Sequence, residues 1–322
     1  MRLPTNPLFA ALRLPVIAAP MFLVSGPDLA VAACKSGLVG AMPTLNARTV
    51  EDLDLWLERI MGALARERSI GPAVPGPFAA NLIVHKSNQR LDADLALLEK
   101  HRVPLVMASV GDASRVVERI HAWGGQVFAD VATVAHAARA AASGVDGLVL
   151  LCGGAGGNTG WLSPLSFVPA VRRIYGGTIA LAGGIASGTA IRAAVELGAD
   201  LAVIGTRFIA ASESLAADEY RQMLVDSTAD DIVLTSDVTG IPANFLRPSL
   251  QRCGFTPSGQ PAGFNTDKEI AVFKKWKDIW AAGQGVGEIR AVQPVSEIVA
   301  ELEKAYRAPS GTQRAPMTTA IA

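Results

Sequence analysis

A cluster of glycines around one amide side chain has the residue types of a binding loop. Five glycines fall within eight residues directly after the apolar run Gly147–Cys152: Gly153, Gly154, Gly156, Gly157 and Gly160. Glycine weakens the interior of strands and helices, so this density is expected where backbone approaches a ligand closely. Asn158 stands among these glycines, and its amide both donates and accepts hydrogen bonds. We expect Asn158 to contact the ligand of this loop.

Two further glycine-containing segments have the composition of a phosphate-binding site. Each follows a short apolar run in the second half of the chain, and their residues are Gly183, Gly184, Gly205 and Thr206. Backbone N–H groups at such positions can converge on a phosphate without obstruction by side chains. The spacing matches neither the dinucleotide-binding fingerprint nor the lysine-containing phosphate loop. The segments therefore predict the phosphate of a mononucleotide cofactor or a sugar phosphate, with tight turns at helix caps as the alternative role.

Two titratable side chains lie at or near the ends of other apolar runs. His85 comes directly after Phe78–Val84, and Asp130 lies near the end of Gln126–Val131. If these runs are barrel strands, both side chains lie at the face where such barrels build their sites. We expect His85 to be a candidate catalytic residue, with pairing to a neighbouring loop as its alternative role. We expect Asp130 to contact cofactor or substrate.

The elements that must position these residues alternate regularly between residues 10 and 228. Candidate strands are Pro15–Ala19, Leu38–Met42, Phe78–Val84, Leu105–Ser109, Gln126–Val131, Gly147–Cys152, Thr178–Ala182 and Leu201–Ile204. Candidate helices are Pro27–Ser36, Val50–Arg66, Leu91–His101, Ala113–Trp123, Val134–Ser143, Leu165–Tyr175, Thr189–Leu197 and Leu215–Ser227. The strands are apolar throughout, as is typical of parallel strands covered on both faces. Eight such units predict an α/β fold, a (β/α)8 TIM barrel, with an open doubly wound sheet as the alternative.

The rest of the chain predicts a smaller addition to the barrel. Residues 229–307 contain a stretch rich in Gly, Pro, Ser and Thr, then two helical patterns, Asp267–Ala282 and Val295–Tyr306. We expect a small helical appendage that packs on the barrel and covers its mouth. Residues 308–322 are mostly small or polar, which predicts a flexible tail.

Composition excludes several classes of partner. Lys and Arg together number 29, as do Asp and Glu, so no overall field favours nucleic acid or an anionic membrane. The three cysteines are far apart and lack zinc-binding spacing, which favours a reduced cytoplasmic compartment. No cluster of His, Asp and Glu predicts a metal site. We expect a monomer or a homodimer acting on a small molecule.

Several motifs occur in a fixed order along the chain. They are Ala19-Pro20-Met21, Ala80-Asn81-Leu82-Ile83-Val84, Ala155-Gly156-Gly157-Asn158-Thr159-Gly160, Ala182-Gly183-Gly184-Ile185, Gly205-Thr206-Arg207-Phe208 and Trp280-Ala281-Ala282-Gly283-Gln284-Gly285. In this order they resemble the FMN-dependent nitronate monooxygenases, formerly called 2-nitropropane dioxygenases. The resemblance covers about residues 10–310.

The resemblance implies FMN over the barrel mouth, with its phosphate at the Gly183, Gly184, Gly205 and Thr206 segments. Further cofactor contacts would come from Ala19, Pro20, Met21, Asn81, Gly156 and Gly157. The chain departs from the family at Asn158, where most relatives have a histidine that is taken as the catalytic base. It also departs at Ala129, where close relatives often have a second histidine. Asparagine is no base near neutral pH, although it can orient a substrate.

The resemblance therefore predicts an oxidoreductase that oxidises an alkyl nitronate, with O2 reoxidising the flavin. An alternative is a flavin reductase that uses NAD(P)H and acts on a quinone or enoyl substrate, because hydride transfer to the flavin needs no active-site base. A flavin-binding protein with little turnover is a second alternative. A phosphosugar-processing barrel without flavin fits Ala19-Pro20-Met21 and Asn81 less well.

Overall fold

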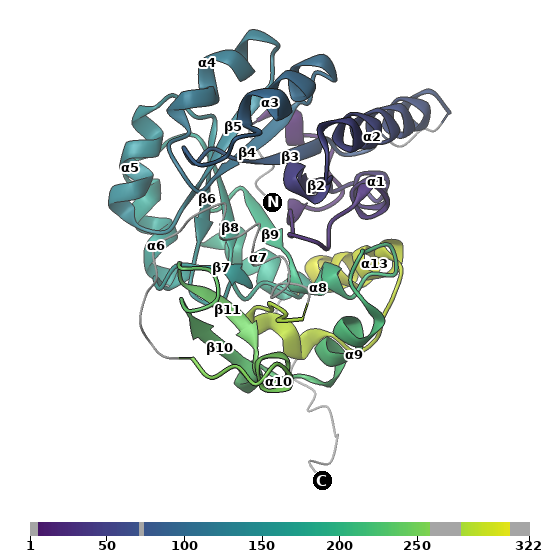
Figure 1. Cartoon of the computed structure of the whole chain (residues 1–322), viewed down its shortest axis with the longest axis vertical. Helices are drawn as coiled ribbons and strands as arrows, with labels where there is room; N and C mark the ends of the chain where they lie inside the picture. Colours follow the sequence, from purple (N-terminus) through teal and green to yellow (C-terminus); the bar gives the residue numbers. More distant parts are fainter. Residues whose placement is uncertain (1–5, 71–73, 258–277, 310–322) are drawn as a thin grey trace.

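The computed structural model describes residues 6–70, 74–257 and 278–309. Their central feature is a closed barrel of eight parallel strands (Figure 1). In barrel order these are β1 (Val16–Ala18), β2 (Val39–Pro43), β3 (Phe78–Ile83), β4 (Leu105–Ser109), β5 (Gln126–Val131), β6 (Gly147–Leu151), β8 (Thr178–Ala182) and β9 (Leu201–Ile204). Each strand overlaps one candidate strand of the sequence analysis. The closed barrel confirms the (β/α)8 prediction over an open sheet.

Helices surround the barrel and bury its outer face. They are α1 (Pro27–Lys35), α2 (Val50–Ile70), α3 (Leu91–Lys100), α4 (Ser114–Ala122), α5 (Val134–Ala142), α6 (Pro164–Arg172), α7 (Gly188–Glu196), α8 (Thr206–Ile209) and α9 (Asp218–Asp226). The last predicted barrel helix corresponds to α9, and α8 is an additional short helix directly after β9. TIM barrels often place such a short helix beside a phosphate site.

The barrel interior is filled from its N-terminal end by the first described residues. Phe9 lies in the turn η1 (Pro7–Phe9), is 1% exposed, and packs edge-on against Phe128 with ring centroids 5.8 Å apart. Phe128 in turn explains the glycine that begins β6, because a Cβ at Gly147 would lie 2.4 Å from its ring. The floor of the barrel is therefore a packed aromatic core, and open space for a ligand must lie at the other end.

A second, three-stranded sheet joins the appendage to the glycine loop. Its strands are β7 (Gly157–Asn158), β10 (Ile232–Thr235) and β11 (Ala243–Leu246), in the order β10-β11-β7. Strand β11 is antiparallel to both neighbours, and its pairing sets Ala243 opposite Asn158. No pattern in the sequence predicts these strands. The loop that carries Asn158 is thus held from outside the barrel.

The C-terminal residues wrap back over the barrel (Figure 1). Their elements are η3 (Ala229–Asp231), α10 (Arg247–Arg252), η4 (Gln284–Glu288) and α13 (Val295–Arg307), while η2 (Thr44–Asn46) follows β2. Helix α13 lies so close to α7 that a Cβ at Gly188 would meet Leu302 O at 2.2 Å. This helix matches the predicted pattern Val295–Tyr306.

The other helical pattern in the appendage, Asp267–Ala282, has a different outcome. Its residues 267–277 lie outside the described residues, as do residues 310–322 of the predicted tail. Residues 278–282 are not helical, so the prediction is wrong for them. Ala281 instead forms an antiparallel bridge with Phe245 of β11. Tertiary pairing therefore overrides the local helical pattern there.

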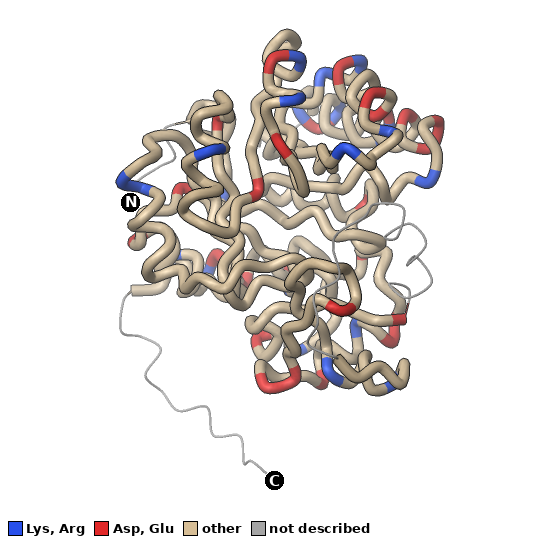
Figure 2. The backbone as a smooth tube through the Cα atoms, turned by 60° about the vertical axis from the view of Figure 1, so that its left-hand side comes forward, with Lys and Arg blue, Asp and Glu red and all other residues tan. Residues whose placement is uncertain are grey.

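Charges of both signs are interspersed over the outer helices (Figure 2). None of the described helices has both the length and the apolar character needed to cross a bilayer. Within residues 6–70, 74–257 and 278–309, no group of three or more His, Cys, Asp or Glu side chains could hold a metal ion.

Candidate active site at the barrel mouth

Three polar side chains line the inside of the barrel near the C-terminal ends of neighbouring strands. They are Asn81 on β3, Ser109 on β4 and Asp130 on β5. The residues two positions earlier on the same strands belong to the apolar cluster that fills the barrel. Because side chains alternate between the faces of a strand, the three polar residues also point inward. They form the part of the interior nearest the mouth.

A chain of hydrogen bonds links these three side chains. Asn81 Nδ2 donates to the carbonyl of Met107 at 3.0 Å and to Ser109 Oγ at 2.5 Å. A carbonyl only accepts, so this contact fixes which end of the Asn81 amide carries the hydrogens. Ser109 accepts from Asn81 and donates its own proton to Asp130 Oδ2. The direction of donation therefore runs from Asn81 through Ser109 to Asp130.

Asp130 is partly buried, and one of its two accepting oxygens is already occupied. Burial raises the pKa of its carboxyl from 3.8 to about 6, and the hydrogen bond from Ser109 opposes this rise. Its neighbour on the β6 side is the uncharged Val149, which stands opposite it in register. Among the described residues, no group donates to the other oxygen, Oδ1. Asp130 can therefore change charge near neutral pH.

Asn158 is held in place by its backbone while its side chain lacks a partner. The Oδ1 atom is buried and accepts no hydrogen bond from the described residues. The adjacent Thr159 donates its hydroxyl to Cys152 O at 2.8 Å, and Asn244 Nδ2 donates to Ala155 O at 2.7 Å. A buried polar atom without a partner costs free energy, and such atoms often mark ligand sites. The environment of Asn158 thus suits a polar ligand.

The glycines of the Asn158 loop divide into two groups. A Cβ at Gly156 would lie 2.7 Å from Gly283 N, so this glycine is required by backbone of the C-terminal region. The side chain of Gln284 occupies the corresponding space at Gly154. Gly157 has a φ of +65° and open space where a Cβ would be. The loop was expected to approach a ligand, and part of its glycine content serves protein packing instead.

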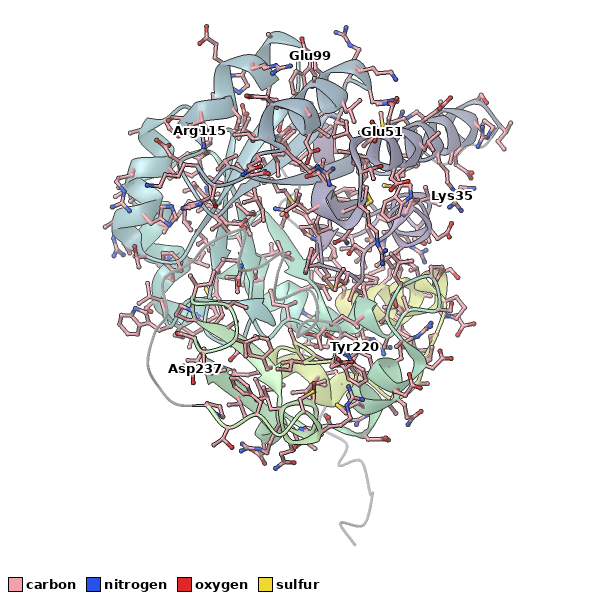
Figure 3. All side chains as sticks on the ribbon, viewed as in Figure 1. Lys35, Glu51, Glu99, Arg115, Tyr220 and Asp237 are labelled. Atoms are coloured by element: carbon pink, nitrogen blue, oxygen red, sulfur yellow. The ribbon has the colours of Figure 1, made fainter. Side chains whose placement is uncertain are left out.

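The segment Trp280–Gly285, here called the C-terminal strap, presses on this loop. Tyr220 of α9 stacks on Trp280 with ring centroids 4.8 Å apart and donates its hydroxyl to Ala281 O. Tyr220 lies among the appendage elements in Figure 3. At the other end of the strap, Gly283 N donates to Thr206 Oγ1 at 2.9 Å. The strap therefore bridges the Asn158 loop and α8.

The predicted phosphate residues meet the predicted flavin residues at the β1–β9 boundary. A Cβ at Gly205 would lie 3.5 Å from both Ala19 Cβ and Met21 Sδ. Pro20 lies between those two residues in the turn after β1. Thr206 is the first residue of α8, where backbone N–H groups lack partners within the helix. Five of the predicted cofactor residues are thus brought together.

The other predicted phosphate segment, Gly183 and Gly184, is only partly available to a ligand. Gly184 has a φ of +67° and open space at its Cβ position, yet its N–H donates to Gly154 O at 3.2 Å. Gly183 lies against Cys152, with 3.1 Å between its Cβ position and Cys152 Cβ. A cavity of about 320 Å³ adjoins this segment and is lined by Gly184, Ala186, Ser187, Ala229, Gln284, Gly285, Gly287 and Glu288. It does not include Asn81, Asp130 or Asn158.

Asn46 is a positioning residue that the sequence did not reveal. It is 9% exposed, its Nδ2 donates to Met21 O at 2.9 Å, and its Oδ1 accepts from Leu23 N at 2.9 Å. Leu23 has a φ of 60°, an uncommon conformation for this residue type. Asn46 therefore fixes the turn that carries Ala19, Pro20 and Met21.

His85 belongs to a different set of contacts. Its Nδ1 lies 2.7 Å from Ser87 Oγ in its own loop, and Arg115 of α4 donates to the preceding carbonyl of Val84 at 2.6 Å. The hydrogen bond to Ser87 lies within the loop of His85 itself, and the catalytic role predicted for His85 stays a prediction.

The residues at the mouth fit a flavin mononucleotide in three respects. The open positions at Gly157 and Gly184 leave room beside the backbone, and the buried Asn158 oxygen needs a donor. The Thr206 N–H at the start of α8 suits a phosphate. Fold and site together define the class: a (β/α)8 barrel with a candidate active site at the C-terminal ends of its strands.

Comparison with known proteins identifies the family. Residues 77–304 match the model of the nitronate monooxygenase family, and the chain belongs to that family. It is 28% identical to a nitronate monooxygenase of Paraburkholderia phytofirmans over 90% of this chain and 91% of the relative. The match confirms the resemblance drawn from the motifs.

Two further comparisons bear on fold and substrate. The chain is 25% identical to (3aS,4S,5R,7aS)-5-hydroxy-7a-methyl-1-oxo-octahydro-1H-indene-4-carboxyl-CoA dehydrogenase of Mycobacterium tuberculosis, over 73% of this chain and 64% of that relative. It thus spans less than two thirds of that relative's length. The structure of nitroalkane oxidase from Streptomyces ansochromogenes aligns with a TM-score of 0.76 and 25% identity, covering 94% of this chain and 98% of that one.

Proposed function

We propose that this protein is an FMN-dependent oxidoreductase that oxidises an alkyl nitronate, with O2 as the final electron acceptor. Family membership and the nitroalkane oxidase likeness support flavin chemistry of this kind. The observation that carries the substrate assignment is the Asn158 amide beside the open Gly157 position. Its Nδ2 can donate to a nitronate oxygen, and its buried Oδ1 is left to accept from an N–H group of the bound cofactor. A nitronate is already an anion, so its oxidation needs no base at Asn158.

In this proposal the chain's own residues bind and orient. Gly205 and Thr206 hold the FMN phosphate, while Ala19, Pro20 and Met21 border the flavin. Gly183, Gly184, Gly156 and Gly157 leave room for it, and Asn81 supplies a polar contact. When bound, FMN would supply the redox chemistry, as the acceptor of electrons from the substrate and their donor to O2. Asn158 holds the nitro group of the substrate through its amide.

A second candidate has its own support. The relative from Mycobacterium tuberculosis is named as a dehydrogenase of a hydroxylated acyl-CoA. A flavin reductase that uses NAD(P)H remains an alternative because it too needs no base at Asn158. A flavin-binding protein with little turnover would retain the same glycine segments.

Anaerobic reduction of the purified protein separates these candidates. The protein should be yellow, and ethylnitronate alone should bleach its flavin absorbance, with recovery on admission of air. Bleaching by NADH or NADPH but not by nitronate would replace the proposal with the reductase. A yellow protein that none of these compounds bleaches would support a flavin-binding protein with little turnover. A colourless protein that does not bind added FMN would overturn all three candidate functions.

A further inference from the structure

The motif resemblance sets Asn158 at the position of the family's catalytic base, and the barrel mouth contains an ionisable side chain nearby in Asp130. Asp130 Oδ1 accepts no hydrogen bond from the described residues, whereas Oδ2 accepts from Ser109. The carboxyl lies at the end of β5 and points inward, one strand from β6, after which the Asn158 loop begins. A carboxylate with one fixed and one available oxygen has the geometry of a proton acceptor.

We infer that Asp130 is the base that removes the α-proton from a neutral nitroalkane, so that the protein forms its own nitronate. This inference rests on the proposed function and extends its substrate class from nitronates to nitroalkanes. Asp130 was expected to contact cofactor or substrate, and here it takes a chemical step.

The step balances without any further reactant. The α-carbon–hydrogen bond breaks, its proton forms an O–H bond on Asp130 Oδ1, and the electron pair remains with the carbon and the nitro group. The products are a nitronate anion and a neutral carboxyl, which returns its proton to water. The Asn158 amide orients the nitro group while this occurs.

Ser109 and Asn81 are positioning residues for this base. Asn81 Nδ2 donates to Ser109 Oγ, so the single hydroxyl proton of Ser109 is directed to Asp130 Oδ2. This contact occupies Oδ2 and leaves Oδ1 without a donor among the described residues. It also favours the ionised carboxyl, because a donor stabilises negative charge.

The surroundings of Asp130 determine the pH range in which its carboxylate can accept a proton. Burial brings the pKa of the carboxyl to about 6, high enough for an effective base and low enough for ionisation at pH 7. The residues beside it on β4 and β6, Ser109 and Val149, carry no charge. Proton removal should therefore increase with pH through the titration of this one group.

The test compares nitroethane with preformed ethylnitronate in the FMN-loaded protein. Asp130→Asn should lower kcat/KM for nitroethane by about 100-fold or more, the usual contribution of a general base. It should leave ethylnitronate oxidation within about threefold. Asp92→Asn, the same substitution on the exposed face of α3, is the control and should change neither.

A second measurement observes the proton directly. Proton NMR in anaerobic D2O should show catalysed loss of the nitroethane α-proton signal with wild-type protein and none above buffer with Asp130→Asn. Ser109→Ala removes the donor that lowers the pKa of Asp130, so the rise of nitroethane turnover with pH should shift to higher pH.

The outcomes separate the two claims. If the wild-type flavin is not reduced by ethylnitronate, the proposed function fails and this inference fails with it. If ethylnitronate is oxidised but nitroethane is neither oxidised nor exchanged, the inference alone is overturned. Retention of nitroethane exchange by folded, yellow Asp130→Asn would overturn it equally.

Discussion

At the scale of single residues, two asparagines in the same region have opposite roles. Asn244 Nδ2 donates to Ala155 O at 2.7 Å and so holds the Asn158 loop, whereas Asn158 Oδ1 is buried without a donor. An unpaired buried acceptor lowers the stability of the protein without ligand. The position of Asn158 is therefore better explained by binding than by folding.

Alanine at these two positions should separate the roles. Asn158→Ala should leave the free energy of unfolding of the apoprotein unchanged or raise it by about 1 kcal/mol, while raising KM for nitronate. Asn244→Ala should lower the free energy of unfolding by about 1–3 kcal/mol, since the buried carbonyl of Ala155 loses its donor. Urea unfolding measures both. A loss of more than about 2 kcal/mol in Asn158→Ala would show that its oxygen has a partner.

The residues of the candidate site differ in how visible they are in the sequence. Asn81 and Asp130 interrupt apolar runs near their ends, and a polar residue there signals a function. Ser109 ends such a run too, but a small hydroxyl gives no signal until the register of β3, β4 and β5 places it between the other two. His85 was a reasonable candidate by type, and its loop contacts became evident only in three dimensions.

At the scale of elements, the barrel was predictable and the second sheet was not. Parallel strands covered on both faces are continuous apolar runs, so local composition locates them. Strand β7 has two residues, one of them glycine, and it exists because β11 pairs with it from some 85 residues further along the chain. No local pattern encodes such a partner.

The close contact between the C-terminal strap and the Asn158 loop predicts that a side chain at Gly156 is not tolerated. Gly156→Ala places a Cβ 2.7 Å from Gly283 N, and backbone cannot yield as a side chain does. We expect a loss of about 1–3 kcal/mol in the free energy of unfolding and weaker FMN binding. Thermal unfolding and flavin fluorescence measure these quantities. Gly287→Ala in η4, which has open space at its Cβ position, is the matched control.

An unchanged Gly156→Ala protein would contradict the packing described here. Loss of stability in Gly287→Ala to the same extent would show that η4 tolerates no side chain for a reason unrelated to the strap.

At the scale of the whole molecule, Asp130 links stability to pH. Its carboxyl has an ordinary pKa of 3.8 in the unfolded chain and about 6 in the folded protein, so the folded state binds the proton more tightly. The stabilisation is complete below about pH 4 and is lost as pH rises through about 6. The difference between the two pKa values corresponds to a change of at most about 3 kcal/mol in the free energy of unfolding.

The free energy of unfolding of the apoprotein should therefore fall between pH 4 and 7 less steeply in Asp130→Asn than in wild type. Urea titrations at several pH values check this, with Asp92→Asn again as the control. Equal slopes in all three proteins would show that Asp130 titrates normally in the folded state.

The path of the chain also sets an order of assembly. The barrel closes when β9 pairs with β1, at residue 204, but the strap that presses on the Asn158 loop ends at residue 285. During synthesis, some eighty residues must still emerge after the last barrel strand before the loop gains its outer support. A nascent barrel therefore precedes its own candidate site, and the cofactor can be captured firmly only after the strap has also been made.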